Sequence, residues 1–181
     1  MDKVFVVLKD GTKVCLSAWQ KLYGLEIGSD KVGKFFSLKD PRLARDLKEF
    51  GELVVNELLI RILDAFREKT GKPVNINSFN RTEAYQAKLK SEGYRTAEHS
   101  PHVAKMAADI DTTSAVETRE WVKVLTLLSA QLGIKIRLGF EQYLSAGQTF
   151  IHVDVCPEYF AKGKPFNKQP HPIQWENSTM W

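Results

Sequence analysis

Apolar and polar positions recur with regular periods along most of the chain, and they predict a mixture of short strands and amphipathic helices. Two short apolar runs, 3–8 and 13–16, flank Asp10-Gly11. This dipeptide favours a tight hairpin turn, because glycine adopts a positive φ at no steric cost. Residues 18–39 show no clear period. The N-terminal part is therefore expected to be a hairpin followed by an irregular segment.

A helical spacing of three and four appears in the next part of the chain. It begins at Asp40-Pro41, where an aspartate can accept hydrogen bonds from free amides and proline suits the first turn. Apolar residues keep this spacing from Leu43 to Ile62. The pattern predicts one long helix that runs to about Lys69.

Shorter elements are expected in the remainder. Strands are predicted at residues 74–78, 107–111, 134–138 and 149–155, and helices at residues 82–91 and 116–132. Helices interspersed with short strands of unequal length favour an α+β domain.

Composition narrows the class of protein. The chain has 181 residues, of which 43% are apolar and 27% charged, which is typical of a single globular domain. The net charge of +4 permits an anionic partner without requiring one. No sequence motif of a nucleic-acid reader accompanies that charge, so we expect no nucleic-acid partner. No stretch is long and apolar enough to span a membrane.

Two features bear on the cellular compartment. The N-terminus shows no basic segment followed by a long apolar one, so we expect synthesis in the cytoplasm without a signal peptide. Cys15 and Cys156 lie far apart in the sequence. They could form a disulfide, but two buried thiols suit a cytosolic product better.

Three groups of chemically active side chains interrupt the apolar pattern, each at or near a predicted strand. They are Ser100-Pro101-His102 with Asp109 seven residues later, His152-Val153-Asp154 in the last strand, and Arg81 just after the strand at 74–78.

The strand at 149–155 indicates where its polar residues lie. Side chains alternate between two faces of a strand. Ile151, Val153 and Val155 form an aliphatic face that belongs to the core. His152 and Asp154 are on the other face and should line a surface or a cleft.

Neighbouring strands would bring three of these side chains together. If strands 107–111 and 149–155 pair, His102, Asp109 and His152 converge. Two imidazoles and a carboxylate suit a catalytic zinc ion, which keeps a fourth position for water. The alternative is that these residues are ordinary solvated side chains on the surface.

A family resemblance favours the metal site. The segment from Ser78 to Asp154 resembles the zinc D-alanyl-D-alanine carboxypeptidases and L-alanyl-D-glutamate endopeptidases, whose domain also occurs in hedgehog proteins. The shared motifs, in order, are Ser-x-x-Arg at 78–81, Ser-x-His at 100–102, Ala-x-Asp at 107–109 and a histidine on a late strand, His152.

The resemblance implies a fold and a set of site residues. The fold would be a small antiparallel sheet flanked by helices, with His102, Asp109 and His152 as the ligands of a Zn²⁺ cofactor. Arg81 would be catalytic and would also bind substrate, because its fork of donors can polarise a carbonyl. Ser100 would bind substrate. The alternatives are a surface ion pair for Arg81 and a local turn bond for Ser100.

Two departures from the family pattern are visible. Lys105 stands where the family often has glycine, and Thr149 stands where many members have an acidic general base. Asp154 is the best substitute, either as a catalytic base or as a residue that orients a ligand. Glu141 is a weaker candidate, and a third alternative is that the chain has no general base.

The activity implied by the resemblance is hydrolysis of peptidoglycan peptide stems by a zinc metallopeptidase, as a carboxypeptidase or an endopeptidase. The protein would be a monomer that acts at the bacterial cell wall, as a phage or prophage lysin does. The alternative is a non-catalytic metal- or wall-binding module of the same fold. We divide the chain into an N-terminal segment at 1–40, a peptidase-like core at 41–160 and a packed tail at 161–181.

Overall fold

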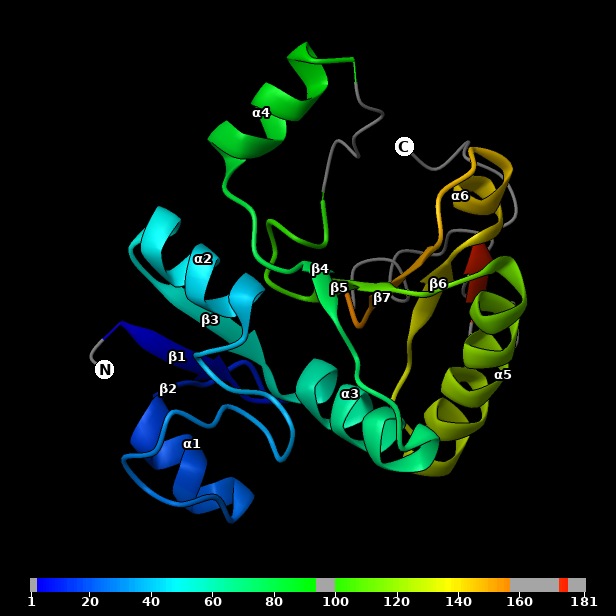
Figure 1. Cartoon of the computed structure of the whole chain (residues 1–181). Helices are drawn as coiled ribbons and strands as arrows, with labels where there is room; N and C mark the ends of the chain where they lie inside the picture. The colour runs from blue at the N-terminus through cyan, green and yellow to red at the C-terminus, as the bar shows by residue number, and fades with distance from the viewer. Residues whose placement is uncertain (1–2, 94–99, 157–172, 176–181) are drawn as a thin grey trace.

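A three-stranded sheet forms the N-terminal part of the protein (Figure 1). The computed structural model describes residues 3–93, 100–156 and 173–175. In this sheet β1 (Val4–Val7) lies between β2 (Lys13–Cys15), to which it is antiparallel, and β3 (Leu53–Asn56), to which it is parallel. The predicted hairpin is confirmed, and α1 (Leu16–Tyr23) follows it directly.

The prediction of a single long helix after Asp40 is wrong. The chain forms α2 (Pro41–Phe50), then β3, then α3 (Glu57–Thr70). Gly51 ends α2 in the left-handed conformation, with φ 74°, and its N–H donates to the Leu47 carbonyl. Asn56 then starts α3 by accepting hydrogen bonds from two backbone amides. The apolar spacing continues across the break because all four residues of β3 are buried.

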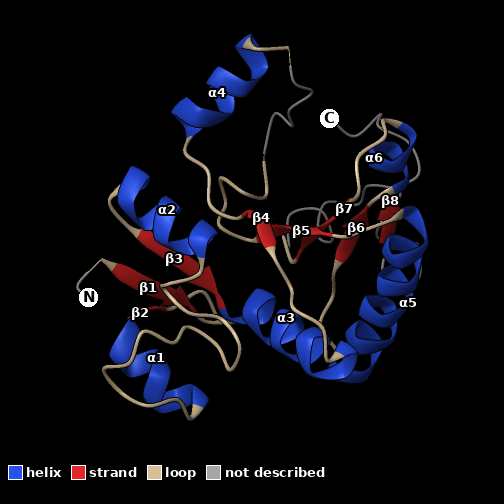
Figure 2. Cartoon of the chain, viewed as in Figure 1, coloured by secondary structure: helices blue, strands red, loops and turns tan. Residues whose placement is uncertain are grey.

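A five-stranded sheet forms the other half, in the order β4-β5-β7-β6-β8 (Figure 2). Its strands are β4 (Ile76–Ser78), β5 (Ala107–Asp111), β6 (Arg137–Gly139), β7 (Phe150–Asp154) and β8 (Ile173–Trp175). Neighbours are antiparallel except for β6 and β8. The helices between these strands are α4 (Glu83–Ser91), α5 (Ala115–Leu132) and α6 (Glu141–Ser145). The predicted α+β class is confirmed.

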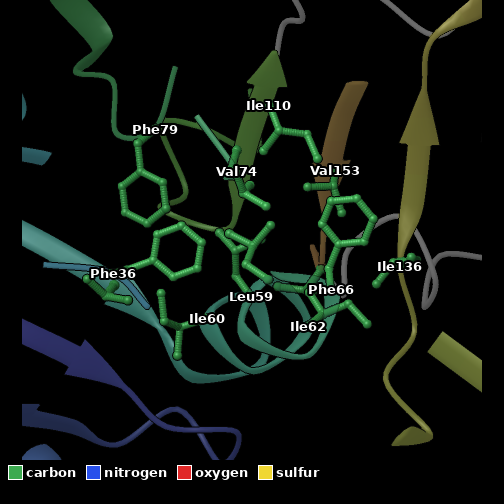
Figure 3. Close-up of a cluster of buried hydrophobic side chains, with 14 of the residues drawn as sticks. Phe36, Leu59, Ile60, Ile62, Phe66, Val74, Phe79, Ile110, Ile136 and Val153 are labelled. Carbon is green, nitrogen blue, oxygen red and sulfur yellow. The ribbon is translucent and has the colours of Figure 1, made fainter. Parts of the chain in front are cut away.

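Helix α3 joins the two sheets through one continuous apolar core. Figure 3 shows Ile60 of α3 near Phe36, with Phe79 on the other side of the Phe36 ring, and Phe66 of the same helix near Val153 of β7. All of these side chains are buried. The N-terminal sheet therefore shares its core with the strands that carry the candidate site.

Other expectations have mixed outcomes. Among the described residues, no helix has the length and apolar content needed to cross a bilayer. Cys156 is buried as expected, but Cys15 is exposed. Of the tail at 161–181, only β8 lies within the described residues.

Candidate metal centre

The candidate site lies where β5 and β7 pair. Asp109 and His152 are direct partners across these antiparallel strands. His102 enters from the turn before β5, where the Ser100 carbonyl accepts from two amides and the Met106 N–H donates to the Pro101 carbonyl. This turn brings His102 back against the paired strands, as the sequence predicted.

Three side-chain atoms converge there. His102 Nε2 lies 3.2 Å from Asp109 Oδ1 and 3.2 Å from His152 Nδ1, and the last two atoms are 2.8 Å apart. All three residues are buried, with His102 and His152 each 2% exposed. The three could hold one metal ion, since their ligand atoms lie within 4.8 Å of one another.

The outward atoms of both imidazoles indicate their tautomers. His102 Nδ1 lies 2.6 Å from the Phe79 carbonyl oxygen, which can only accept, so Nδ1 carries the proton. His152 Nε2 lies 3.1 Å from Asp154 Oδ2 and donates to it in the same way. With both rings neutral, His102 Nε2 and His152 Nδ1 present lone pairs toward Asp109. This is the donor set that a divalent cation requires.

Charges within the cluster shift its titration. Burial acts to raise the pKa of Asp109, but the adjacent imidazoles outweigh it and the pKa is lowered. Burial lowers the pKa of His102, against the opposing effect of Asp109. Burial also acts to lower the pKa of His152, yet its hydrogen bonds to Asp109 and Asp154 raise it overall. A proton on His152 Nδ1, where the two hydrogen bonds favour it, would occupy the place of a cation.

Affinity for a divalent metal ion is expected to rise with pH, because the ion and a proton compete for His152 Nδ1. The raised pKa of His152 predicts about a tenfold gain per pH unit below that pKa and a plateau above it. The same proton stabilises the metal-free fold fully below the unfolded pKa of about 6.5, and that contribution is lost as pH rises through the higher folded pKa. Competition against a chromophoric chelator between pH 6 and 8 measures the affinity. An affinity independent of pH would contradict the assignment.

Arg81 lies against one of the candidate ligands. Its Nη2 donates to Asp109 Oδ2 at 3.3 Å and to Ser78 Oγ at 3.0 Å, and its Nη1 donates to Gln86 Oε1 at 3.4 Å. The side chain is 19% exposed, so this is a partly buried ion pair and not a surface one. The sequence analysis did not single out Gln86. Its position one turn into the helix that follows Arg81 could have indicated that the two side chains lie close together.

His152 and Asp154 were expected to line a surface or a cleft, but both side chains are buried, so the expectation of a surface is wrong. Asp154 is fully buried, because β7 lies between β5 and β6 and its carboxylate has a buried cationic partner. Arg137 of β6 donates to it from Nη2 at 2.8 Å and from Nε at 3.1 Å. The Cys156 N–H also donates to Asp154 Oδ1, at 3.1 Å. Sequence reasoning missed Arg137, although an arginine between Ile136 and Leu138 in a predicted strand was a signal for a buried charge.

The ion pair also governs the titration of Asp154. Burial acts to raise the pKa of this carboxyl, but Arg137 and His152 lower it overall. Asp154 is therefore a carboxylate that contacts the ring of His152 opposite the cluster, at Nε2.

The structure places the remaining predicted residues as follows. Ser100 is buried in the turn before His102. The Thr149 carbonyl accepts from the Thr112 N–H beside β5. Glu141 pairs with Arg119, with Nε and Oε1 2.9 Å apart.

Lys105 stands in the turn before β5, at the position where the sequence analysis noted a departure from glycine. Its φ is 63°, in the left-handed region that favours glycine. Its Nζ donates to the Arg81 carbonyl, so the side chain ties this turn to the segment that carries Arg81. A lysine thus holds a backbone conformation here that glycine adopts more readily.

Comparisons with known proteins bear on the fold. No protein-family model matches the chain, and no curated protein matches its sequence. Among solved structures it is similar to the L-Ala D-Glu endopeptidase ChiX of Serratia marcescens, with a TM-score of 0.50 and 14% identity. The match covers 70% of this chain and 100% of that one. The fold is shared with an endopeptidase. The predicted resemblance is thereby confirmed for the fold alone.

Proposed function

We propose that the protein is a zinc-dependent peptidase that hydrolyses peptide bonds in peptidoglycan stems at the bacterial cell wall. The observation that carries the proposal is the convergence of His102 Nε2, Asp109 Oδ1 and His152 Nδ1 in a buried cluster. Nitrogen and oxygen donors without a thiolate suit a catalytic zinc ion. The endopeptidase fold and the shared order of motifs support the substrate class.

In this proposal, one group of residues would hold the metal ion and another group would bind the substrate. A bound zinc ion would supply an activated water and a Lewis acid. His102, Asp109 and His152 would hold it, while Arg81 would stabilise the negative charge that develops on the scissile carbonyl oxygen. Ser100, two residues before the first ligand, would bind substrate.

Arg81 keeps a donor for this role. Its described contacts use Nε, both hydrogens of Nη2 and one hydrogen of Nη1. A guanidinium has five N–H donors in a fixed fork, so one Nη1 hydrogen has no acceptor among the described residues. That hydrogen would bind the substrate carbonyl in the proposed complex.

We infer that Asp154 orients His152 and does not act as the general base. Its Oδ2 accepts the Nε2 proton of His152, and the lone pair at Nδ1 then points toward the other two ligands. Carboxylate–histidine pairs of this kind fix the tautomer of a metal ligand. The bonds from Arg137 and the Cys156 amide hold the carboxylate in this place.

A second candidate function is a non-catalytic metal- or wall-binding module. The favouring observation is that both candidate bases are in ion pairs, Asp154 with Arg137 and Glu141 with Arg119. Thr149 has no acidic group to replace them. On this alternative the centre would bind zinc and the wall without cleaving peptide bonds.

Digestion of purified peptidoglycan separates the two candidates. We expect the zinc-loaded protein to release fragments with new amino termini, detected by mass spectrometry, and a chelator to abolish them. The matched control is Asp111→Asn, which changes an exposed aspartate on the same strand as Asp109 and should remain active. Zinc binding and co-sedimentation with the wall, without new termini, would favour the module and overturn the peptidase proposal.

A further inference from the structure

The three residues after β4, 79–81, contact the candidate metal centre from outside. The Phe79 carbonyl accepts the Nδ1 proton of His102 at 2.6 Å. The Arg81 N–H donates to the His102 carbonyl at 3.2 Å, and Arg81 Nη2 donates to Asp109 Oδ2. This segment therefore fixes two of the three candidate ligands.

Asn80, in the middle of this segment, is held by the N-terminal elements. Asp46 Oδ2 of α2 accepts the Asn80 N–H at 2.9 Å, and Asn80 Nδ2 donates to the Val54 carbonyl of β3 at 3.0 Å. Asp46 is fully buried and Asn80 is 2% exposed. Figure 1 shows α2 beside β4, at the edge of the five-stranded sheet. The hydrogen bonds thus run from the N-terminal elements to the candidate centre.

The segment has little freedom to adjust if one of these bonds is lost. The Phe79 side chain is buried in the core near Phe36 (Figure 3). A buried carboxylate is costly unless it is paired and hydrogen-bonded. Asp46 accepts a hydrogen bond from the Asn80 N–H and forms an ion pair with Arg42, whose Nε lies 2.9 Å from Oδ1. Displacement of Asn80 would move the Phe79 carbonyl and Arg81 together, because they are its immediate neighbours.

We propose that Asp46 is a positioning residue for the metal centre. By accepting the Asn80 N–H, it holds the Phe79 carbonyl and Arg81 where His102 and Asp109 need them. The inference rests on the proposed function, since it takes the cluster as a zinc centre. It gives α2 a role in that centre although α2 contributes no ligand.

Zinc affinity in three variants tests the proposal. Asp46→Ala is expected to bind Zn²⁺ about tenfold more weakly in competition with a chromophoric chelator, at the lower end of what loss of a ligand's hydrogen-bond partner costs. Asp46→Asn keeps an acceptor oxygen and should stay within about threefold of the wild type. Asp64→Ala is the matched control. Asp64 is also a buried carboxylate, but the amides that it accepts from are those of Lys34 and Phe35. This control should lose stability and keep its zinc affinity.

A second measurement does not need the metal. Long-range proton–nitrogen spectra of the metal-free protein report the tautomer and environment of the His102 ring. We expect the Nδ1–H signal to shift in Asp46→Ala and to stay unchanged in Asp64→Ala. If the wild type binds no zinc, the proposed function fails, while this comparison still decides whether Asp46 positions His102.

Two results would overturn the proposal. One is an unchanged zinc affinity and an unchanged His102 signal in Asp46→Ala. The other is an equal change in Asp64→Ala, which would indicate general destabilisation only. If Asp46→Ala does not fold, Asp46→Leu replaces it, because leucine has a similar shape and also lacks an acceptor for the Asn80 N–H. A loss of zinc affinity in the same direction is then expected, and no loss counts against the proposal.

Discussion

Replacement of His102 by alanine is expected to abolish both zinc binding and peptide hydrolysis. The variant removes one of the three candidate ligands and keeps Asp109 and His152. The loss of zinc affinity should exceed the 10- to 100-fold that removal of an outer hydrogen-bond partner typically costs. Elemental analysis of the purified variant and release of new amino termini from peptidoglycan measure the two effects.

The control for this variant is Asp111→Asn on β5. Asp111 is exposed and is not one of the three converging residues, so stoichiometric zinc and activity should persist. A His102→Ala protein that keeps one tightly bound zinc ion would contradict the ligand assignment. A variant that loses zinc but still cleaves peptide stems would contradict the proposed mechanism.

Replacement of Arg137 by methionine is expected to destabilise the protein by about 3–5 kcal/mol, because it leaves the Asp154 carboxylate buried without its cation. Arg137 and Asp154 are 1% and 0% exposed, so solvent does little to screen the pair. Urea unfolding in the presence of a chelator measures the free energy of unfolding without a contribution from bound metal.

A double variant checks the cause of this destabilisation. Arg137→Met with Asp154→Leu removes both charges, and most of the lost stability should return, because an apolar pair of similar volume can replace a buried ion pair. The double variant should still bind zinc more weakly than the wild type, since His152 loses the acceptor for its Nε2 proton. A loss below about 1 kcal/mol in Arg137→Met would show that Asp154 does not need its partner.

The convergence of the site was predicted on the condition that the strands at 107–111 and 149–155 pair, and the family resemblance favoured that outcome. Seven residues between His102 and Asp109 allow a turn followed by the start of a strand, and the alternation in β7 places His152 on a defined face. The hairpin at Asp10-Gly11 followed from local turn chemistry. The turn and the alternation depend on short-range geometry, whereas the meeting of Asp109 and His152 also needs the pairing of β5 with β7.

Features that depend on pairing between distant segments were not predictable in this way. The helical spacing from Leu43 to Ile62 concealed β3, whose four residues are buried because they pair with β1 and pack under α2. Gly51 marked the break, but a single glycine within a periodic pattern is a weak signal. Arg137 and Asp46 were missed because each acts on the site through a partner on another element.

The two thiols of the chain differ in their access to reagents. Cys15 is exposed before α1, whereas Cys156 is buried just past β7, and its amide is bonded to the Asp154 carboxylate that orients His152. An alkylating dye should therefore mark position 15 at once and position 156 only when the end of β7 opens. The rate of the second, slower reaction would measure how often the structure opens locally beside the centre, and the rate at Cys15 would serve as the internal reference.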